Sequence, residues 1–136
     1  MKILKTYARV FTNDARKALE TFQALHGGEP HLVFRFGDWD LIGIGDVFIV
    51  GGTDESLAPI RDSHGPLIVD DLDETRRLIE QAGGEITRPI FPAPTGRGLY
   101  ARHADGTVVE YVEWKPELVE KFIRAPQREG KLSSEL

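Results

Sequence analysis

The stretch Asp105-Gly-Thr-Val-Val-Glu-Tyr-Val-Glu-Trp114 combines a turn with a strand, and the rest of the chain builds the surroundings of that strand. Asp-Gly is a turn dipeptide, because glycine adopts positive φ without steric cost. The β-branched and aromatic residues that follow are typical of a strand, whose side chains alternate between two faces. Glu110 then lies at the centre of an apolar strand, where a carboxylate is costly to bury without a partner. Two interpretations stay open: an edge strand with Glu110 in water, or a cavity in which another group pairs with Glu110.

The order of elements around this strand occurs twice along the chain. The first half predicts a strand at 3–11, a helix capped by Asn13 or Asp14, and strands at 31–36, 40–44 and 47–50. The second half predicts a strand at 64–69, a helix capped by Asp70, Asp71 or Asp73, and strands at 86–91, 99–103 and 108–114. Both helices end in Gly-Gly-Glu, and Leu19 and Leu78 are among the apolar residues expected to face the core.

This internal repeat predicts an α+β fold of two tandem βαβββ modules, whose curved mixed sheets surround a central cavity. The expected arrangement is one domain at 1–125, with module one at 1–52, a linker at 53–63, module two at 64–115 and a C-terminal helix at 116–125. Residues 126–136 are polar and are expected to form a loosely held tail.

Composition restricts the function classes. The 136 residues carry a net charge of −5 with both signs interspersed, which argues against nucleic acid as the main partner. The absence of cysteine excludes disulfides, thiolate metal sites and a cysteine nucleophile. The N-terminal residues lack the apolar run of a signal peptide, and no stretch is long enough to span a membrane. A cytoplasmic location is therefore expected.

Superposing the two halves brings together candidate site residues. Aligning the first strands places Lys5 on His64, and aligning the last strands places Ile49 on Glu110. If a pseudo-twofold axis relates the modules, these side chains converge near that axis. A charge pair between Lys5 and Glu110 inside the cavity, with His64 nearby, follows as a hypothesis.

The paired modules, His64-Gly-Pro-Leu-Ile-Val-Asp-Asp71 before a helix, and the closing Pro92…Gly98…Asp105-Gly-Thr-Val-Val-Glu110 resemble the vicinal oxygen chelate superfamily over residues 3–115. That superfamily contains glyoxalase I, extradiol dioxygenases, fosfomycin-modifying enzymes and bleomycin-resistance binding proteins, so the resemblance is more specific for fold than for function. Its catalytic members typically hold one divalent metal with His or Glu at four strand positions.

The resemblance implies that His64 and Glu110 match two of these ligand positions, whereas Lys5 and Ile49 occupy the other two. A protonated lysine and an isoleucine offer no lone pair to a metal. Catalytic sites usually keep three protein ligands, so the expectation is no cofactor, with a divalent metal on His64 and Glu110 as the alternative.

Small-molecule sites are mostly apolar with a few polar anchors, which gives a set of candidate ligand-binding residues. The set comprises Lys5, Tyr7, Arg9, Trp39, Ile49, His64, Glu110 and Trp114.

Two functions compete at this point, and whether the chain is an enzyme stays open. The favoured one is a metal-independent small-molecule-binding protein of the glyoxalase/bleomycin-resistance type that sequesters a small, partly aromatic ligand or antibiotic. The alternative is a metal-dependent glyoxalase-like lyase, isomerase or dioxygenase that uses His64 and Glu110. A third possibility is a protein that acts through its dimer surface. A homodimer is expected, because members of the superfamily commonly pair modules between chains.

Overall fold

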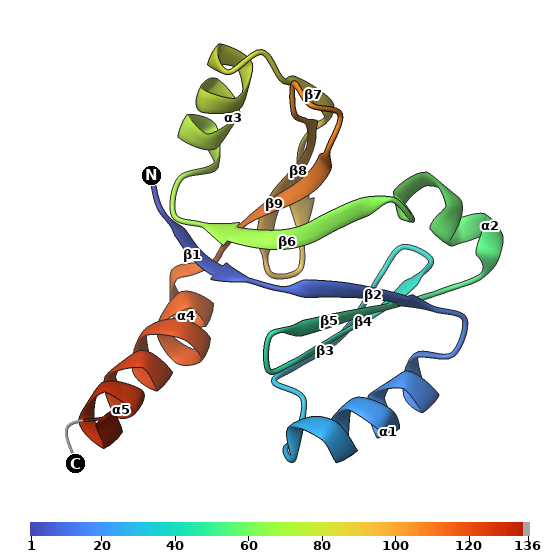
Figure 1. Cartoon of the computed structure of the whole chain (residues 1–136), viewed down its shortest axis with the longest axis vertical. Coiled ribbons are helices and arrows are strands. Elements are labelled where there is room, and N and C mark those ends of the chain that lie inside the picture. The colour runs from blue at the N-terminus through green and yellow to red at the C-terminus, as the bar shows by residue number, and fades with distance from the viewer. Residues whose placement is uncertain (135–136) are drawn as a thin grey trace.

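The computed structural model describes residues 1–134, and its strands form two sheets that carry helices (Figure 1). The strands are β1 (Ile3–Thr6), β2 (Ala8–Thr12), β3 (Leu32–Phe36), β4 (Trp39–Ile44), β5 (Val47–Gly51), β6 (Ser63–Val69), β7 (Glu85–Ala93), β8 (Gly96–Arg102) and β9 (Val108–Trp114). The helices are α1 (Ala15–His26), α2 (Asp54–Leu57), α3 (Leu72–Gln81), α4 (Pro116–Val119) and α5 (Ala125–Ser134). The predicted α+β architecture of two βαβββ modules is confirmed.

The first strand of the prediction is divided between the two sheets. One sheet has the order β1-β6-β9-β8-β7 and the other β2-β5-β4-β3. Tyr7 separates the two halves, and its amide donates to the carbonyl of Pro66 at 3.3 Å. β1 pairs antiparallel with β6, while β2 pairs parallel with β5. A continuous strand at 3–11 is therefore wrong, and the split strand ties each module to the other.

The long helices begin and end as the sequence predicts. Asp14 caps α1 by accepting a hydrogen bond from the amide of Lys17 at 3.1 Å, and Gly27 ends the helix with φ 82°. Asp71 caps α3 in the same way, through the amide of Glu74 at 2.9 Å. Side chains of α1 pack on the sheet of β4 and β5, and α3 packs on the sheet of β7, β8 and β9.

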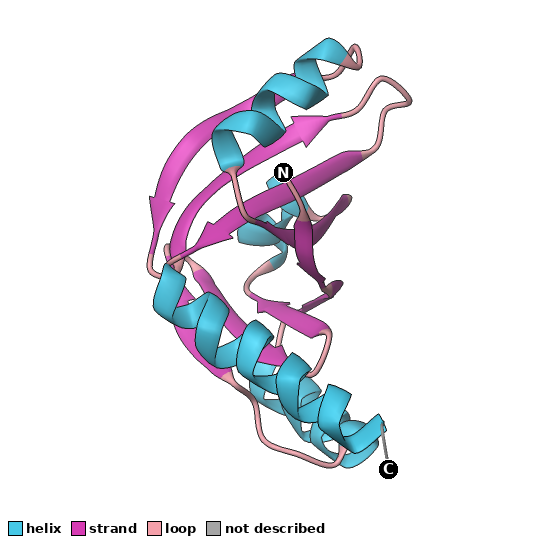
Figure 2. Cartoon of the chain, turned by 90° about the vertical axis from the view of Figure 1, so that its left-hand side faces the viewer, coloured by secondary structure: helices cyan, strands magenta, loops and turns pink. Residues whose placement is uncertain are grey.

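The inner and outer faces of the sheets bury separate groups of apolar residues. The largest group lies between the sheets and includes Phe48, Ile68, Tyr100, Val112 and Trp114. The smaller groups lie under α1 and under α3. Figure 2 shows the strands as a curved layer with helices on its outside.

The buried face of α3 differs from the prediction at Leu78 and at Ala82, which were expected to face the core and are exposed. Leu72 and Thr75 are 0% and 1% exposed, whereas Leu78 is 40% exposed. The helical period places Leu78 at the margin of the stripe formed by Leu72, Thr75 and Ile79, so its side chain turns away from the sheet.

The predicted linker and tail both contain more regular structure than expected. Residues 53–63 include α2 and a 3-10 turn, which bury Leu57 and Ile60 against the core between the sheets. The C-terminal helix was expected to end at 125, but a π-helical segment at Glu120–Arg124 connects α4 to α5, which continues to Ser134. Pro126 does not end the helix. It lies at the start of α5, directly after the π-helical segment, where the backbone hydrogen bonds change from the π to the α pattern. Residues 135–136 of the predicted tail lie outside the described residues.

Within residues 1–134, no helix combines the length and the apolar character that a bilayer span requires.

Candidate ligand-binding cavity

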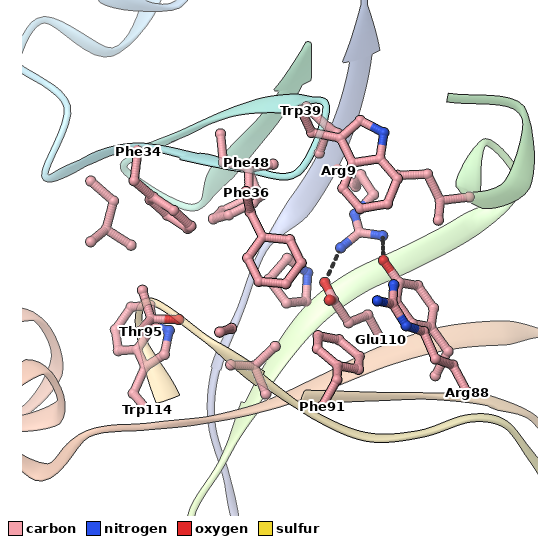
Figure 3. Close-up of a pocket in the computed structure, with 18 residues that line it drawn as sticks. Arg9, Phe34, Phe36, Trp39, Phe48, Arg88, Phe91, Thr95, Glu110 and Trp114 are labelled. Atoms are coloured by element: carbon pink, nitrogen blue, oxygen red, sulfur yellow. Dashed lines mark hydrogen bonds and ion pairs between the residues drawn. The ribbon is translucent and has the colours of Figure 1, made fainter. Parts of the chain in front are cut away.

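A cavity with mainly apolar walls, many of them aromatic rings, lies between the inner faces of the two sheets (Figure 3). Its lining comprises Arg9, Leu32, Phe34, Phe36, Trp39, Leu41, Phe48, Val50, Ile60, Pro66, Arg88, Phe91, Ala93, Thr95, Tyr100, Glu110, Val112 and Trp114. The cavity volume is about 50 Å³, so a ligand must be small and flat, or the rings must move apart.

A buried ion pair joins the two sheets inside this cavity. Nη2 of Arg9, on β2, donates to Oε1 of Glu110, on β9, and the two side chains are 3% and 14% exposed. Nη1 of Arg9 donates to Ser63 Oγ at 2.8 Å and to the Tyr100 hydroxyl at 3.4 Å. Ser63 in turn donates to the carbonyl of Ile60 at 2.5 Å. Nε of Arg9 is buried and has no hydrogen-bond partner among the described residues.

The protonation states of these groups follow from their surroundings. Burial lowers the pKa of the Arg9 guanidinium, but the charge of Glu110 and the contact with Tyr100 outweigh it, and the net pKa is raised. Burial, assisted by the charge of Glu110, raises the pKa of Tyr100 to about 12. At neutral pH the cavity therefore presents a cationic guanidinium, held by a carboxylate, and a neutral hydroxyl.

The structure divides the predicted site residues into two groups. Arg9, Trp39, Glu110 and Trp114 line the cavity, whereas Lys5, Tyr7, Ile49 and His64 do not. Ser63 and Tyr100, which complete the hydrogen bonds of Arg9, were not among the predicted residues.

The predicted partner of Glu110 was wrong. Lys5 lies on β1, before the break at Tyr7, and its Nζ contacts Asp46 at 2.6 Å. Arg9, after the break, is the cation that pairs with Glu110. The chain crosses from one sheet to the other at Tyr7, so Lys5 and Arg9 do not share a face as they would on one continuous strand.

His64 and Ile49 face away from the cavity. His64 is exposed and lies opposite Val109 in the parallel pair of β6 and β9, so it shares a face with Val109 and not with Glu110. Ile49 is 0% exposed and packs beneath α1. The structure therefore does not bring His64 and Glu110 together as a pair of ligands.

Tyr7 lies behind the cavity wall, where its ring packs against Phe48 and Trp114 close to the C-terminal helix. Its ring is 2% exposed, and its hydroxyl contacts Nε2 of His31 at 2.6 Å. The His31 ring packs against Phe122 with the centroids 5.3 Å apart. Burial, together with the charge of Lys5, lowers the pKa of His31 to about 4.

The donor set of the cavity does not fit a catalytic metal. Its lining contains one carboxylate, which is paired with Arg9, and no imidazole. Across the part of the chain that the structure describes, no three or more His, Cys, Asp or Glu side chains gather in a way that could hold a metal ion. A catalytic site usually offers three protein ligands and an open position.

Comparisons with known proteins agree with this architecture. No family model and no curated protein matches the chain. Among solved structures, an uncharacterized protein from Methanosarcina mazei is 33% identical, with a TM-score of 0.76, over 85% of this chain and 95% of that one. A methylmalonyl-CoA epimerase from Mycobacterium tuberculosis is 18% identical, with a TM-score of 0.64, over 87% of this chain and 93% of that one. A methylmalonyl-CoA epimerase from Streptomyces coelicolor is 14% identical, with a TM-score of 0.66, over 83% of this chain and 99% of that one.

The two epimerases show the fold, and the Methanosarcina protein is a closer relative with no stated activity. With two βαβββ modules whose mixed sheets surround a cavity, the chain has the fold of the vicinal oxygen chelate superfamily.

Proposed function

We propose that this protein binds a small, partly aromatic molecule in the cavity between its sheets, without a metal, and sequesters it. One observation carries the proposal: the only carboxylate in the cavity lining is held by a buried guanidinium, among walls made of aromatic rings. Apolar and aromatic walls with a few fixed polar groups are typical of small-molecule sites.

The same ion pair argues against Glu110 as a metal ligand or a general base. The guanidinium charge beside Glu110 repels a second cation, and a Glu110 side chain that moved away to act elsewhere would leave Arg9 buried without its partner, which costs about 3–5 kcal/mol. The metal-dependent alternative also needs His64, which faces the other side of the sheet. The epimerase activity named for two similar structures is not proposed for this chain, because likenesses that distant support the fold alone.

The two tryptophans of the chain provide a direct assay, because Trp39 and Trp114 both line the cavity. A small aromatic molecule that enters the cavity should change the intrinsic fluorescence in a saturable way. Titration of the purified protein with a panel of one- and two-ring aromatic compounds tests this expectation.

A cavity-filling variant makes the assay specific. Ala93 lines the cavity, so Ala93→Leu should occupy the space for the ligand and weaken binding by about tenfold or more. Ala24→Leu makes the same change at an exposed position of α1 and should bind like the wild type. The proposal fails if no compound gives a saturable change, or if both variants bind equally well.

A further inference from the structure

We propose that the ligand is an anion, a planar aromatic carboxylate, and that Arg88 at the edge of the cavity is its charge partner. The inference rests on the proposed function and names the class of ligand that this cavity takes.

The charges of the lining do not balance. The cavity is lined by two guanidiniums, Arg9 and Arg88, and by one carboxylate, Glu110, and its other lining residues are uncharged. Arg9 and Glu110 compensate each other in their ion pair. Arg88 is exposed at the mouth of the cavity and carries the remaining charge, in a chain whose net charge is −5. An anionic ligand restores neutrality in the cavity, whereas a cationic ligand adds to the imbalance.

Arg88 is held in place by a ring and not by an acid. Its guanidinium lies 4.2 Å from the centroid of Phe91, which stacks on Tyr100 with the centroids 6.2 Å apart. The described residues place no carboxylate within ion-pair distance of Arg88, although the other arginine of the lining has one. Stacking on an aromatic face leaves the N–H groups at the edge of the guanidinium plane available, and that edge fits a carboxylate through two parallel hydrogen bonds.

The cavity also has more hydrogen-bond donors than partners for them. The Tyr100 hydroxyl accepts from Arg9, and its own hydrogen has no acceptor within the described part of the chain. Nε of Arg9 is likewise a buried donor without a partner among these residues. Glu110 accepts from Nη2 of Arg9 through Oε1, and no hydrogen bond joins it to Nε of Arg9 or to the Tyr100 hydroxyl. The cavity therefore offers unpaired donors, which a ligand with acceptor oxygens satisfies.

The walls beside these donors select a flat ring. Phe36 from β3 and Phe91 from β7 come from opposite sheets, and their centroids are 6.1 Å apart. Figure 3 shows both rings close to Glu110, with Arg88 to the right of Glu110 and Phe91. The two rings are tilted by 49° and pack against each other, so a planar ring enters when they move apart. With its carboxylate at Arg88 and Tyr100, that ring uses both the stacking surface and the free donors.

The test compares three ligands of the same shape and different charge. Tryptophan fluorescence, checked by calorimetry, should show that benzoate binds about tenfold more tightly than neutral benzamide, and that cationic benzylamine binds weakest. Arg88→Gln should remove the preference, so that benzoate and benzamide bind with similar affinity. Arg76→Gln, which removes the same charge from an exposed position on α3, should keep the preference. Raising the salt concentration from about 0.05 M to about 0.5 M should weaken benzoate binding in the wild type and in Arg76→Gln, but not in Arg88→Gln.

The outcomes separate the two proposals. Equal binding of benzoate and benzamide, or an unchanged preference in Arg88→Gln, overturns the assignment of an anionic ligand and leaves the binding function intact. Failure of every aromatic compound to bind the wild type overturns the binding function, and the assignment with it.

Discussion

Replacing Arg9 by methionine should destabilise the fold severely, because it leaves a carboxylate between the sheets without its counter-charge. The Glu110 side chain is only 14% exposed, and Arg9 is its ion-pair partner. The change also removes the donors that reach Ser63 at 2.8 Å and Tyr100 at 3.4 Å. Methionine has a similar apolar stem, so the packing of the side chain is largely kept.

The magnitude follows from these contacts. Removing one partner of a buried ion pair costs about 3–5 kcal/mol. Water reaches the part of Glu110 that is exposed, which favours the lower end of that range. The two lost hydrogen bonds add about 1 kcal/mol together, since Ser63 keeps its bond to Ile60 and the Tyr100 contact is long. The expected loss in the free energy of unfolding is about 4 kcal/mol, or a fall of about 15 °C in the melting temperature.

A double-mutant cycle isolates the pair. Arg9→Met combined with Glu110→Leu removes both charges and should recover most of the loss, because two apolar side chains in contact need no counter-charge. The free energy of unfolding would be measured by urea denaturation for the wild type, both single variants and the double variant. Additive effects of the two single changes would refute the reasoning.

An exposed ion pair in the same fold serves as the control. Arg35 and Asp40 lie opposite each other on β3 and β4, with the charged atoms 3.1 Å apart and the side chains 63% and 56% exposed. Arg35→Met should cost less than about 1 kcal/mol, because water screens this pair. A similar loss in Arg35→Met and Arg9→Met would mean that the burial of the Arg9–Glu110 pair has no energetic consequence.

The remaining predictions concern the core, pH, metals and assembly. Leu72→Ala should cost about 2–5 kcal/mol in urea denaturation, and Leu78→Ala less than about 1.5 kcal/mol, because Leu72 is 0% exposed and Leu78 is 40% exposed; similar losses would contradict the arrangement of α3. The pKa of His31 is lowered to about 4, so the unfolded chain binds more protons than the native one between about pH 4 and pH 6.5. The stability that depends on neutral His31 should be complete above about pH 6.5 and lost toward about pH 4, by at most about 2 kcal/mol for this partly exposed ring, and His31→Gln should not show that loss. Calorimetry with zinc, nickel or manganese should detect no stoichiometric binding; tight binding that is lost in both His64→Ala and Glu110→Ala would favour the metal-dependent enzyme. Sedimentation should show a homodimer, and a species with the mass of one chain at micromolar concentration would reject it.

The elements that local rules govern were predictable. Aspartate before an apolar helical stripe and Gly-Gly after it mark both long helices, and the structure selects Asp14 and Asp71 from the candidate caps. The duplicated order of elements predicts two modules, and the alternation in β9 places Glu110 and Trp114 on the same face. These features depend on neighbours in the sequence, which the sequence displays directly.

The break at Tyr7 could not be predicted from local patterns. Residues 3–11 contain no glycine or proline, and their alternation suits one continuous strand. The division arises because β1 finds its partner in β6 and β2 finds its partner in β5, which lie in different sheets. That choice of partners depends on the whole fold. Its consequence is that Arg9, and not Lys5, lies opposite Glu110.

The misplacement of Ile49 and His64 has a common cause, since a shift of one residue moves a side chain to the other face of its strand. Ile44 pairs with Val47 across the turn at 45–46, whereas Arg102 pairs with Val108 across the longer turn at 103–107. Val47 packs beneath α1 whereas Val108 packs against the core between the sheets, so aligning the two turns at their glycines placed Ile49 on Glu110 although the two residues face opposite sides.

In β6 the shift comes from an irregularity between His64 and Leu67, where Gly65 has φ 108° and passes so close to β9 that a Cβ would lie 2.8 Å from the Glu110 carbonyl oxygen. The irregularity turns Ser63 toward Arg9 and His64 toward the outer face. Gly-Pro inside a strand pattern indicates such a bulge. Gly65-Pro66 is therefore the signal that predicts Ser63, and not its neighbour, as the residue of this strand that contacts Arg9.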